Sequence, residues 1–249
     1  MGLTMYRLGW IFCLITSWAG AQDNLIRLAS GLTVEPYIIQ EQDAGFEADI
    51  VKAAFAARGY EVEFAYQPLS EAQASFRSES IDGVLTVKAN YPEVAGTYLS
   101  DDYINYRNYA VSLTANDYVL NQIEALRPYR VIGFIQANMA LGDDFKRMTQ
   151  DNPLYIEMPN QRNQVEQLFK RETDVIIIDI RILTYYRNRL THNPKNQPVN
   201  LHPLFETSHY KIAFRDAKIR DVFNSGLKEV RDSGMYDAII DSYLSNPNL

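Results

Sequence analysis

Two apolar runs, SIDGVLTV at 80–87 and ETDVIIIDI at 172–180, constrain the fold of this chain more than any other feature. Each is a mostly continuous stretch of β-branched and other apolar residues, which is typical of strands buried on both faces of a parallel sheet. The two runs begin alike, so Asp82 and Asp174 occupy equivalent positions. Because parallel strands are connected by helices, this repeated pattern predicts two α/β units.

Helix and strand patterns alternate before each run. Polar and apolar residues that alternate indicate strands, whereas apolar residues at helical spacing indicate helices. In the first unit we expect strands at 26–30, 61–66 and 81–87 and helices at 46–55 and 70–80. In the second unit we expect strands at 130–135, 155–158 and 174–179 and helices at 139–149, 163–171 and 182–190. Each unit then has about 100 residues, a normal domain size.

Two extended runs, 108–113 and 209–214, fit inside neither unit. We interpret them as strands that cross between two lobes, with the helices of 218–245 returning to the first lobe. Two lobes joined in this way can bend around a cleft. The expected fold is therefore α/β, with two lobes that are each a small open sheet flanked by helices. The expected boundaries are 22–111 and 213–249 for the first lobe and 112–212 for the second.

The segment 1–21 has the pattern of a cleavable secretory signal peptide. Arg7 precedes an apolar run at 8–18, and Ala19-Gly20-Ala21 supplies the small residues of a cleavage site. The apolar run is too short to span a bilayer, which disfavours the alternative of a membrane anchor. Cys13 lies within this run without the small residues of a lipoprotein cleavage box before it. We therefore expect a periplasmic protein that is exported and not lipidated.

Charge and cysteine content limit the possible partners of the exported chain. With Arg7 removed from the 24 basic residues, the 31 acidic residues leave a net charge of −8. An acidic protein is disfavoured as a nucleic-acid partner. The one cysteine lies in the signal segment, so no disulfide is expected and a core of adequate size must stabilise the fold. We expect a monomer.

Common catalytic and cofactor-binding signatures are absent from the sequence. It contains no G-x-S-x-G, H-E-x-x-H, P-loop or G-x-G-x-x-G motif. The three histidines, His192, His202 and His209, are not spaced as metal ligands on one helix or strand. We therefore expect no catalytic residues, no metal and no cofactor.

Charged residues follow both of the central strands. Asp179 and Arg181 come at the end of the second apolar run, and Lys88 comes at the end of the first. Ligands bind at the carboxyl ends of strands in open α/β sheets, so these side chains are expected to face a cleft between the lobes. Two alternatives stand beside this expectation: Asp179 caps the following helix, and Lys88 is a solvated charge in a loop.

Four segments resemble the family 3 periplasmic solute-binding proteins, the polar amino-acid receptors of ABC importers. They are GFEADIVKAAFAARGYEVEF (45–64), SIDGVLTVKANYPEVAGTYLSDDY (80–103), RETDVIIIDIRIL (171–183) and KIRDVFNSGLKEVRDSGMYDAIIDSYL (218–244). The resemblance covers nearly the whole exported chain and implies the type II periplasmic-binding-protein fold. It also implies that a small solute is captured as the two lobes close around it.

The resemblance implies an amino-acid site that is only partly retained. Asp179 matches the aspartate that binds the α-ammonium group of the ligand, and Tyr37 matches an aromatic residue of the pocket. Val94 stands where the family has an arginine that clamps the α-carboxylate. The resemblance also implies a threonine-bearing turn at a helix start that adds hydrogen-bond donors for the carboxylate, and the segment 136–139, Gln-Ala-Asn-Met, replaces it. Leu69 replaces an aromatic residue.

The missing arginine leaves two possibilities for the ligand. A buried carboxylate without a charged partner costs roughly several kcal/mol. Either Lys88 or Arg107 takes the place of the arginine, or the ligand is an amine or another polar cation. The side chains expected at the ligand are Glu35, Tyr37, Lys88, Ala89, Asn90, Arg107, Asn138 and Asp179.

The expected function is capture of a small polar, amino-acid-like or amine-bearing solute for the inner-membrane permease of an ABC importer. One alternative is an exported sensor component that reports ligand occupancy to a membrane receptor. Another is an enzyme resembling the cyclohexadienyl dehydratases, with Asp179 or Glu35 as general acid. The missing arginine disfavours this enzyme, because its substrates are carboxylates.

Overall fold

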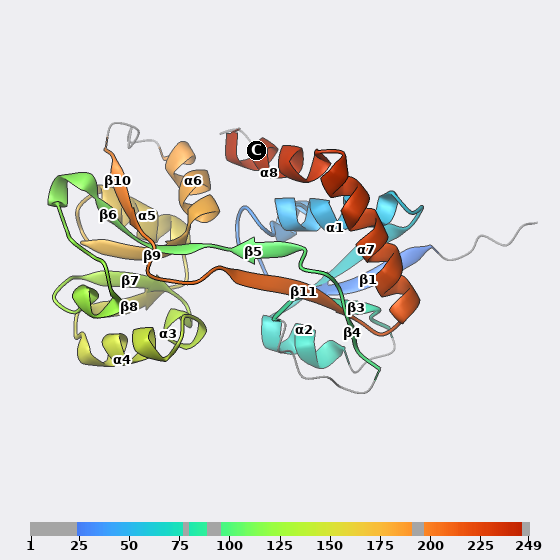
Figure 1. Ribbon diagram of the computed structural model, residues 1–249, viewed down its shortest axis with the longest axis horizontal. Helices are drawn as coiled ribbons and strands as arrows, with labels where there is room; N and C mark the ends of the chain where they lie inside the picture. The colour runs from blue at the N-terminus through green and yellow to red at the C-terminus, as the bar shows by residue number, and fades with distance from the viewer. Residues whose placement is uncertain (1–23, 77–79, 89–95, 191–196, 246–249) are drawn as a thin grey trace, which may run out of the picture.

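The computed structural model describes residues 24–76, 80–88, 96–190 and 197–245. These residues form two lobes side by side, each built on one sheet (Figure 1). The expected signal peptide, 1–21, lies outside the described residues. Within the described residues, no helix has both the length and the apolar character needed to cross a membrane.

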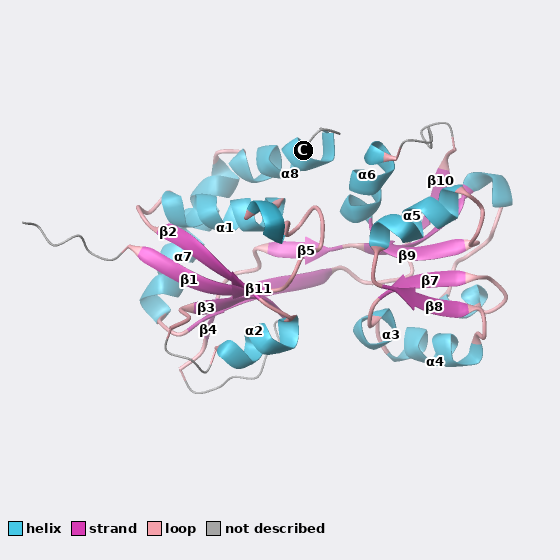
Figure 2. Cartoon of the chain, turned by 180° about the vertical axis from the view of Figure 1, so that it is seen from behind, coloured by secondary structure: helices cyan, strands magenta, loops and turns pink. Residues whose placement is uncertain are grey.

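The first lobe is a six-stranded sheet with helices on both faces. Its elements are β1 (Leu25–Ser30), α1 (Phe46–Ala56), β2 (Glu61–Tyr66), α2 (Leu69–Ser75), β3 (Gly83–Lys88), β4 (Tyr98–Leu99), β5 (Ile104–Tyr106), β11 (Ser208–Phe214), α7 (Ala217–Asp232) and α8 (Met235–Ser245). The strand order is β2-β1-β3-β11-β4, with β5 also paired to β11. Strands β1, β2 and β3 are parallel, and β11 is antiparallel to β3. Helices α1, α7 and α8 cover one face and α2 covers the other (Figure 2).

The second lobe is a five-stranded sheet that is also covered on both faces. Its elements are β6 (Asn108–Leu113), β7 (Val131–Phe134), α3 (Ala137–Ala140), α4 (Asp143–Asp151), β8 (Tyr155–Met158), α5 (Gln161–Phe169), β9 (Val175–Asp179), α6 (Ile180–Arg189) and β10 (Val199–His202). The strand order is β10-β6-β9-β7-β8. Strands β7, β8 and β9 are parallel, whereas β6 is antiparallel to both β9 and β10. Helices α5 and α6 lie on one face and α3 and α4 on the other (Figure 1).

The two apolar runs form the centres of the two sheets, as predicted. Every residue of β9 is buried, and in the neighbouring lobe Val84 and Leu85 of β3 are fully buried on opposite faces. Leu85 packs in the core beneath α1 and α7, whereas Val84 packs with Ala72 of α2. Burial on both faces explains why these strands carry apolar residues without alternation.

The equivalence of Asp82 and Asp174 is confirmed. The Asp82 carboxylate accepts a hydrogen bond from the backbone N–H of Arg27 at 2.8 Å, and Asp174 accepts one from the backbone N–H of Arg130 at 2.9 Å. Each aspartate therefore aligns the start of a central strand with the strand beside it. Both lobes begin their central strand in the same way.

Two connections join the lobes. One passes from β5 through Arg107 into β6, and the other passes from β10 through 203–207 into β11. The expected boundary after 111 falls inside β6, which pairs only with strands of the second sheet, and the boundary after 212 falls inside β11, which pairs with the first sheet. An extended run predicts a strand without indicating which sheet the strand joins, so these boundaries differ from the observed crossing points.

Two helices differ from the prediction. The segment 139–149 was expected as one helix, but α3 and α4 are separated at Gly142, whose φ of 93° lies in the left-handed region that glycine adopts readily. The helix expected at 70–80 is α2, which ends at Ser75.

Helix α7 lies very close to α1 because of one glycine. A Cβ atom placed on Gly226 would lie 1.8 Å from the carbonyl oxygen of Ala54. Glycine at this position therefore allows the two backbones to approach, and it sets the depth at which α7 covers the first sheet.

Candidate ligand-binding site

A cavity of about 400 Å³ lies between the two lobes. Residues at or just beyond the carboxyl ends of the parallel strands line it, which is where open α/β sheets bind ligands. Both lobes and the crossing strands contribute to the walls. The lining includes Gly31, Thr33, Val34, Glu47, Pro68 and Thr86 from the first lobe and Phe134, Ile135, Leu141, Pro159, Gln161 and Asp179 from the second. Tyr106, Asn108, Ser208 and Tyr210 line it from the crossing strands.

Asp179, the last residue of β9, lines the cavity and is only 1% exposed. Its Oδ1 atom accepts hydrogen bonds from the backbone N–H groups of Arg181 and Ile182, at 2.8 and 3.2 Å, and its Oδ2 atom accepts one from that of Arg107 at 2.7 Å. The side chain thus caps α6 and also faces the cavity, so the two interpretations of the sequence are compatible. Burial raises the pKa of the Asp179 carboxyl, and the three backbone donors oppose that rise.

Glu47 is a second buried carboxylate at the cavity, and we did not predict it from the sequence. Its Oε1 atom accepts hydrogen bonds from the Thr86 hydroxyl at 2.8 Å and from the Tyr103 hydroxyl. Its Oε2 atom is buried and has no hydrogen-bond partner within the described part of the chain. Burial raises the pKa of the Glu47 carboxyl, and the hydroxyl groups of Tyr103, Thr86 and Tyr106 oppose that rise.

Gly45 explains why Glu47 is buried. The φ of Gly45 is 114°, and a Cβ atom there would lie 2.2 Å from the carbonyl oxygen of Tyr37. This close approach holds the first turn of α1 against the preceding loop, where the backbone N–H of Glu47 donates to the Tyr37 carbonyl at 3.1 Å. A glutamate on an amphipathic helix is ordinarily exposed, so sequence reasoning passed over Glu47. The available signal was its place in the first helical turn, two residues after a glycine.

Tyr106 forms an aromatic wall that lies close to both carboxylates. Its ring stacks on that of Tyr37, with centroids 4.0 Å apart, and contacts Tyr210 edge-on at 5.4 Å. Burial, together with the negative charges of Glu47 and Asp179, raises the pKa of the Tyr106 hydroxyl. Tyr37, which we expected at the ligand, is instead fully buried behind Tyr106.

Arg181 joins the two lobes and does not line the cavity. From α6 its guanidinium donates to the backbone carbonyl of Asn105 at 2.9 Å, to the side-chain oxygen of Asn105 at 3.2 Å, and to the Tyr37 hydroxyl at 3.4 Å. The charge expected to face the cleft is therefore used to hold α6 of the second lobe against β5 of the first.

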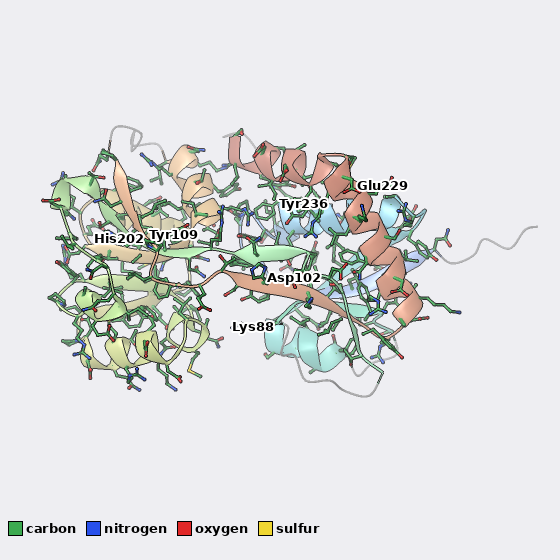
Figure 3. The ribbon with its side chains drawn as sticks, viewed as in Figure 1. Lys88, Asp102, Tyr109, His202, Glu229 and Tyr236 are labelled. Carbon is green, nitrogen blue, oxygen red and sulfur yellow. The ribbon has the colours of Figure 1, made fainter. Side chains whose placement is uncertain are left out.

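The basic side chains expected near the ligand do not reach it. Lys88 is exposed at the end of β3, on the side of the first lobe that faces the second (Figure 3). It pairs with Tyr210 in the strand ladder and is not among the residues that line the cavity. The side chain of Arg107 is also exposed, and its recorded contact with the site is the backbone N–H that binds Asp179. In this structure, neither Lys88 nor Arg107 supplies the charge of the missing arginine to the cavity lining.

The turn at the start of α3 is already occupied by a carboxylate of the protein. The backbone N–H groups of Gln136 and Asn138 donate to Glu157 at 2.7 and 3.0 Å, and the Tyr155 hydroxyl donates to the same carboxylate at 2.9 Å. Asn138, which we expected at the ligand, does not line the cavity. Donors that the resemblance assigns to a ligand carboxylate are therefore engaged within the chain.

The other expected site residues lie elsewhere or outside the described residues. Glu35 lines a smaller neighbouring groove together with Tyr186. Ala89, Asn90 and Val94 lie outside the described residues. Of the expected ligand residues that the structure describes, only Asp179 lines the main cavity.

The cavity is acidic. Within the described residues, its lining contains the carboxylates of Glu47 and Asp179 and no lysine, arginine or histidine. Aromatic and aliphatic side chains such as Tyr106, Phe134 and Ile135 form much of the remaining wall. A positively charged group with an apolar body fits such a lining.

Two α/β lobes joined by two crossing strands around a ligand-sized cavity define the type II periplasmic-binding-protein fold. Solved structures of that fold match the chain. An ancestral cationic amino acid solute-binding protein gives a TM-score of 0.69, with 17% identity, and the match covers 89% of this chain and 96% of the other. The second substrate-binding domain of GlnP from Lactococcus lactis, in an open conformation, gives a TM-score of 0.65 with 17% identity over 91% and 98% of the two chains.

The chain belongs to the bacterial extracellular solute-binding proteins, family 3, whose family model matches residues 26–246. A curated relative, a probable histidine-binding protein of Neisseria gonorrhoeae, is 24% identical over 229 residues, which is 89% of this chain and 84% of the relative. The resemblance inferred from the four sequence segments is thereby confirmed.

Proposed function

We propose that this protein captures a small solute that carries a protonated nitrogen and no carboxylate. The observation that carries the proposal is the acidic cavity, in which Glu47 and Asp179 are buried and no basic side chain belongs to the described lining. A buried carboxylate is stabilised by a cationic partner, and a ligand with an ammonium group supplies one. A ligand carboxylate would instead add a third negative charge.

The groups that would receive an α-carboxylate are engaged or replaced. Glu157 accepts the hydrogen bonds of the Gln136 and Asn138 backbone, and Val94 stands in place of the clamping arginine. An amino acid would therefore bury its carboxylate without a charged partner, at a cost of roughly several kcal/mol. An amine avoids this cost.

The names of two related proteins favour a solute that carries nitrogen. One is a probable histidine-binding protein and the other an ancestral cationic amino acid-binding protein. An amine can retain the nitrogen-bearing side chain of such ligands while it lacks their carboxylate. Tyr106 and Tyr210 then provide aromatic faces beside the cation.

We infer that the protein works in the periplasm and delivers its solute to the inner-membrane permease of an ABC importer. Membership of an extracellular solute-binding family supports this inference. A ligand that contacts both lobes favours the closed arrangement by its greater affinity for that arrangement, which a permease can then recognise. Pull-down of membrane proteins by the liganded protein tests the partner: recovery of permease subunits supports an importer, and recovery of a receptor kinase alone supports the sensor alternative.

Calorimetry with matched ligand pairs tests the chemical class of the solute. Histamine is compared with histidine, and agmatine with arginine, because each pair differs only by the carboxylate. We expect each amine to bind at least about tenfold more tightly than its amino acid, since the uncompensated carboxylate opposes binding. An amino acid that binds more tightly than its amine would overturn the proposal.

A second candidate is a dehydratase, because Glu47 is a buried carboxyl with a raised pKa at a cavity, as general acids often are. In this candidate Glu47 replaces Asp179 or Glu35 as the acid. Incubation of the protein with cyclic hydroxy acids, followed by ultraviolet absorbance for new double bonds, tests it. Unchanged substrate would remove the candidate.

A further inference from the structure

Glu47 and Asp179 reach the same cavity from different lobes. Glu47 belongs to the first turn of α1 in the first lobe, whereas Asp179 ends β9 in the second. The two carboxylates therefore belong to the two bodies that a ligand must hold together. Each is almost fully excluded from solvent, with 0% and 1% of its surface exposed.

The hydrogen bonding of Glu47 is incomplete in a way that points to a ligand. Oε1 is held by Thr86 and Tyr103, which fixes the orientation of the carboxylate. Oε2 is buried and without a hydrogen-bond partner among the described residues. A buried carboxylate oxygen left without a donor is costly, so a donor from the ligand would stabilise it strongly.

Both carboxylates act on one side chain of the cavity wall. The charges of both Glu47 and Asp179 influence the Tyr106 hydroxyl, and the ring of Tyr106 lines the cavity. Within the described residues no basic side chain lines the cavity, although Arg181 behind the lining interacts electrostatically with Asp179. One protonated nitrogen could pair directly with only one of the two carboxylates and would leave the other without a cation from the ligand.

We propose that Glu47 is a second cation-binding carboxylate, and that the solute carries two protonated nitrogens, one for each lobe. This inference rests on the proposed function and narrows its solute to a diamine or a similarly dicationic molecule. One ammonium group binds Glu47 Oε2 and the other binds Asp179, with the intervening chain against Tyr106. Because each end contacts a different lobe, both charges favour closure of the lobes.

Calorimetry with two series of ligands tests the dication. One series consists of α,ω-diaminoalkanes of graded chain length, and the other of n-alkyl monoamines of the same lengths. We expect one diamine length to bind at least about tenfold more tightly than the matching monoamine, because a second charge-assisted hydrogen bond forms. Diamines shorter or longer than this length bind more weakly, because they cannot reach both carboxylates.

Glu47→Gln locates the second nitrogen. Glutamine keeps an oxygen for Thr86 and Tyr103 but removes the charge, so we expect the diamine affinity to fall about tenfold to a hundredfold, toward that of the monoamine. The monoamine affinity is expected to change by less than about threefold, because the monoamine binds Asp179. The matched control is Glu63→Gln, an exposed glutamate of the same lobe outside the cavity, which should leave both affinities unchanged.

The other possible affinity results would each contradict one part of the proposal. Equal affinities for diamines and monoamines of every length would overturn the dication, while amine capture would stand. Equal losses for both ligands in Glu47→Gln would show that Glu47 acts only in folding, and the thermal unfolding curve of the variant provides that comparison. Binding of amino acids without binding of any amine would overturn the proposed function itself. The comparison in the unmutated protein does not depend on how well the variant folds.

Discussion

At the scale of single residues, one carboxylate serves two purposes at Asp179. Three backbone N–H groups bind it, two of them at the start of α6, while it remains part of the cavity lining. Its geometry is therefore fixed before any ligand arrives. A preorganised acceptor loses little conformational entropy on binding, which increases affinity.

Asp179→Asn should weaken amine binding and lower the stability of the fold. Asparagine keeps one oxygen to cap α6, but it removes the charge and leaves one backbone donor without an acceptor, a cost of about 1–3 kcal/mol in unfolding free energy. Affinity for an amine should fall at least about tenfold. Calorimetry and urea unfolding measure the two effects, with Asp151→Asn on the surface of α4 as control. Unchanged affinity would exclude Asp179 from the binding site.

Amine affinity should fall as the solution becomes acidic. The pKa values of Glu47 and Asp179 are both raised by burial above their usual values near about 4, whereas an ammonium group stays protonated up to about pH 10. Below the raised pKa values the carboxyls are neutral, so the attraction for the cation is lost. Calorimetry across the acidic pH range measures the change in amine affinity. The variant Glu47→Gln lacks one of the two titrating carboxyls, so its affinity should depend less on pH. Affinity that rises toward acidic pH would contradict both carboxylates as ligands.

The same pKa shifts have the opposite effect on the free protein. Because both carboxyls have a higher pKa when folded, the folded state binds protons more readily than the unfolded state between the ordinary and the raised values. Their contribution to the free energy of unfolding is fully present below the ordinary pKa values and is lost as pH rises through the raised ones. Thermal unfolding without ligand, compared at mildly acidic and neutral pH, should show this in the unmutated protein and less of it in Glu47→Gln.

A residue of the site could be predicted from the sequence where its position at the end of a strand is enough to place it at the cleft. Asp179 follows an apolar run, and the end of such a strand reaches the cleft in any open sheet. Glu47 was not predictable, because its burial depends on the close approach of Gly45 to the Tyr37 carbonyl, which no periodicity indicates. Lys88 occupies the equivalent strand end, yet its side chain is exposed, since position does not determine side-chain direction.

At the scale of elements, the packing of α7 on α1 depends on a single residue without a side chain. Gly226→Ala should destabilise the first lobe by about 1–3 kcal/mol, although alanine favours helices more than glycine, because the new methyl group would overlap the Ala54 carbonyl. Urea unfolding measures the change. Lys228→Ala, on the exposed side of α7, should change stability by less than about 0.5 kcal/mol. Equal stabilities of the two variants would contradict this account of the helix contact.

Central elements followed from the sequence more reliably than crossing elements. Strands β3 and β9 are mostly apolar because both faces are covered, and that pattern is local. The sheet that β6 or β11 joins is determined by pairing with strands that are distant in the sequence. The apolar pattern of the sequence therefore could not place the lobe boundaries at 111 and 212. Gly142 separates α3 from α4 through its positive φ angle, which apolar periodicity does not indicate.

At the scale of the whole molecule, α6 connects the lobes at a place apart from the crossing strands. Arg181 donates to the Asn105 carbonyl, Asn188 to the Leu244 carbonyl at 2.8 Å, and Arg189 to the Tyr243 carbonyl at 3.2 Å. All three acceptors belong to the first lobe. These contacts exist in the arrangement of the lobes described above, so they favour that arrangement over one in which the lobes are further apart.

Arg181→Ala should shift the balance between lobe arrangements. Loss of the interlobe hydrogen bonds should raise the radius of gyration of the free protein and weaken ligand binding by about tenfold or less, since a charged donor to a carbonyl is removed. Small-angle scattering and calorimetry measure the two effects. Arg162→Ala, whose ion pair lies within α5, is the control and should change neither. An unaltered radius together with unaltered affinity would contradict this prediction.

The carboxylate of Glu157 affects how well free amino acids can compete with the solute for this site. It holds the backbone donors of the α3 turn at 2.7 and 3.0 Å, and as a covalent part of the chain it is always present beside them. A free amino acid would have to displace an intramolecular acceptor that no dilution removes. Under the proposed function, abundant amino acids in the surroundings should therefore be poor inhibitors of amine binding.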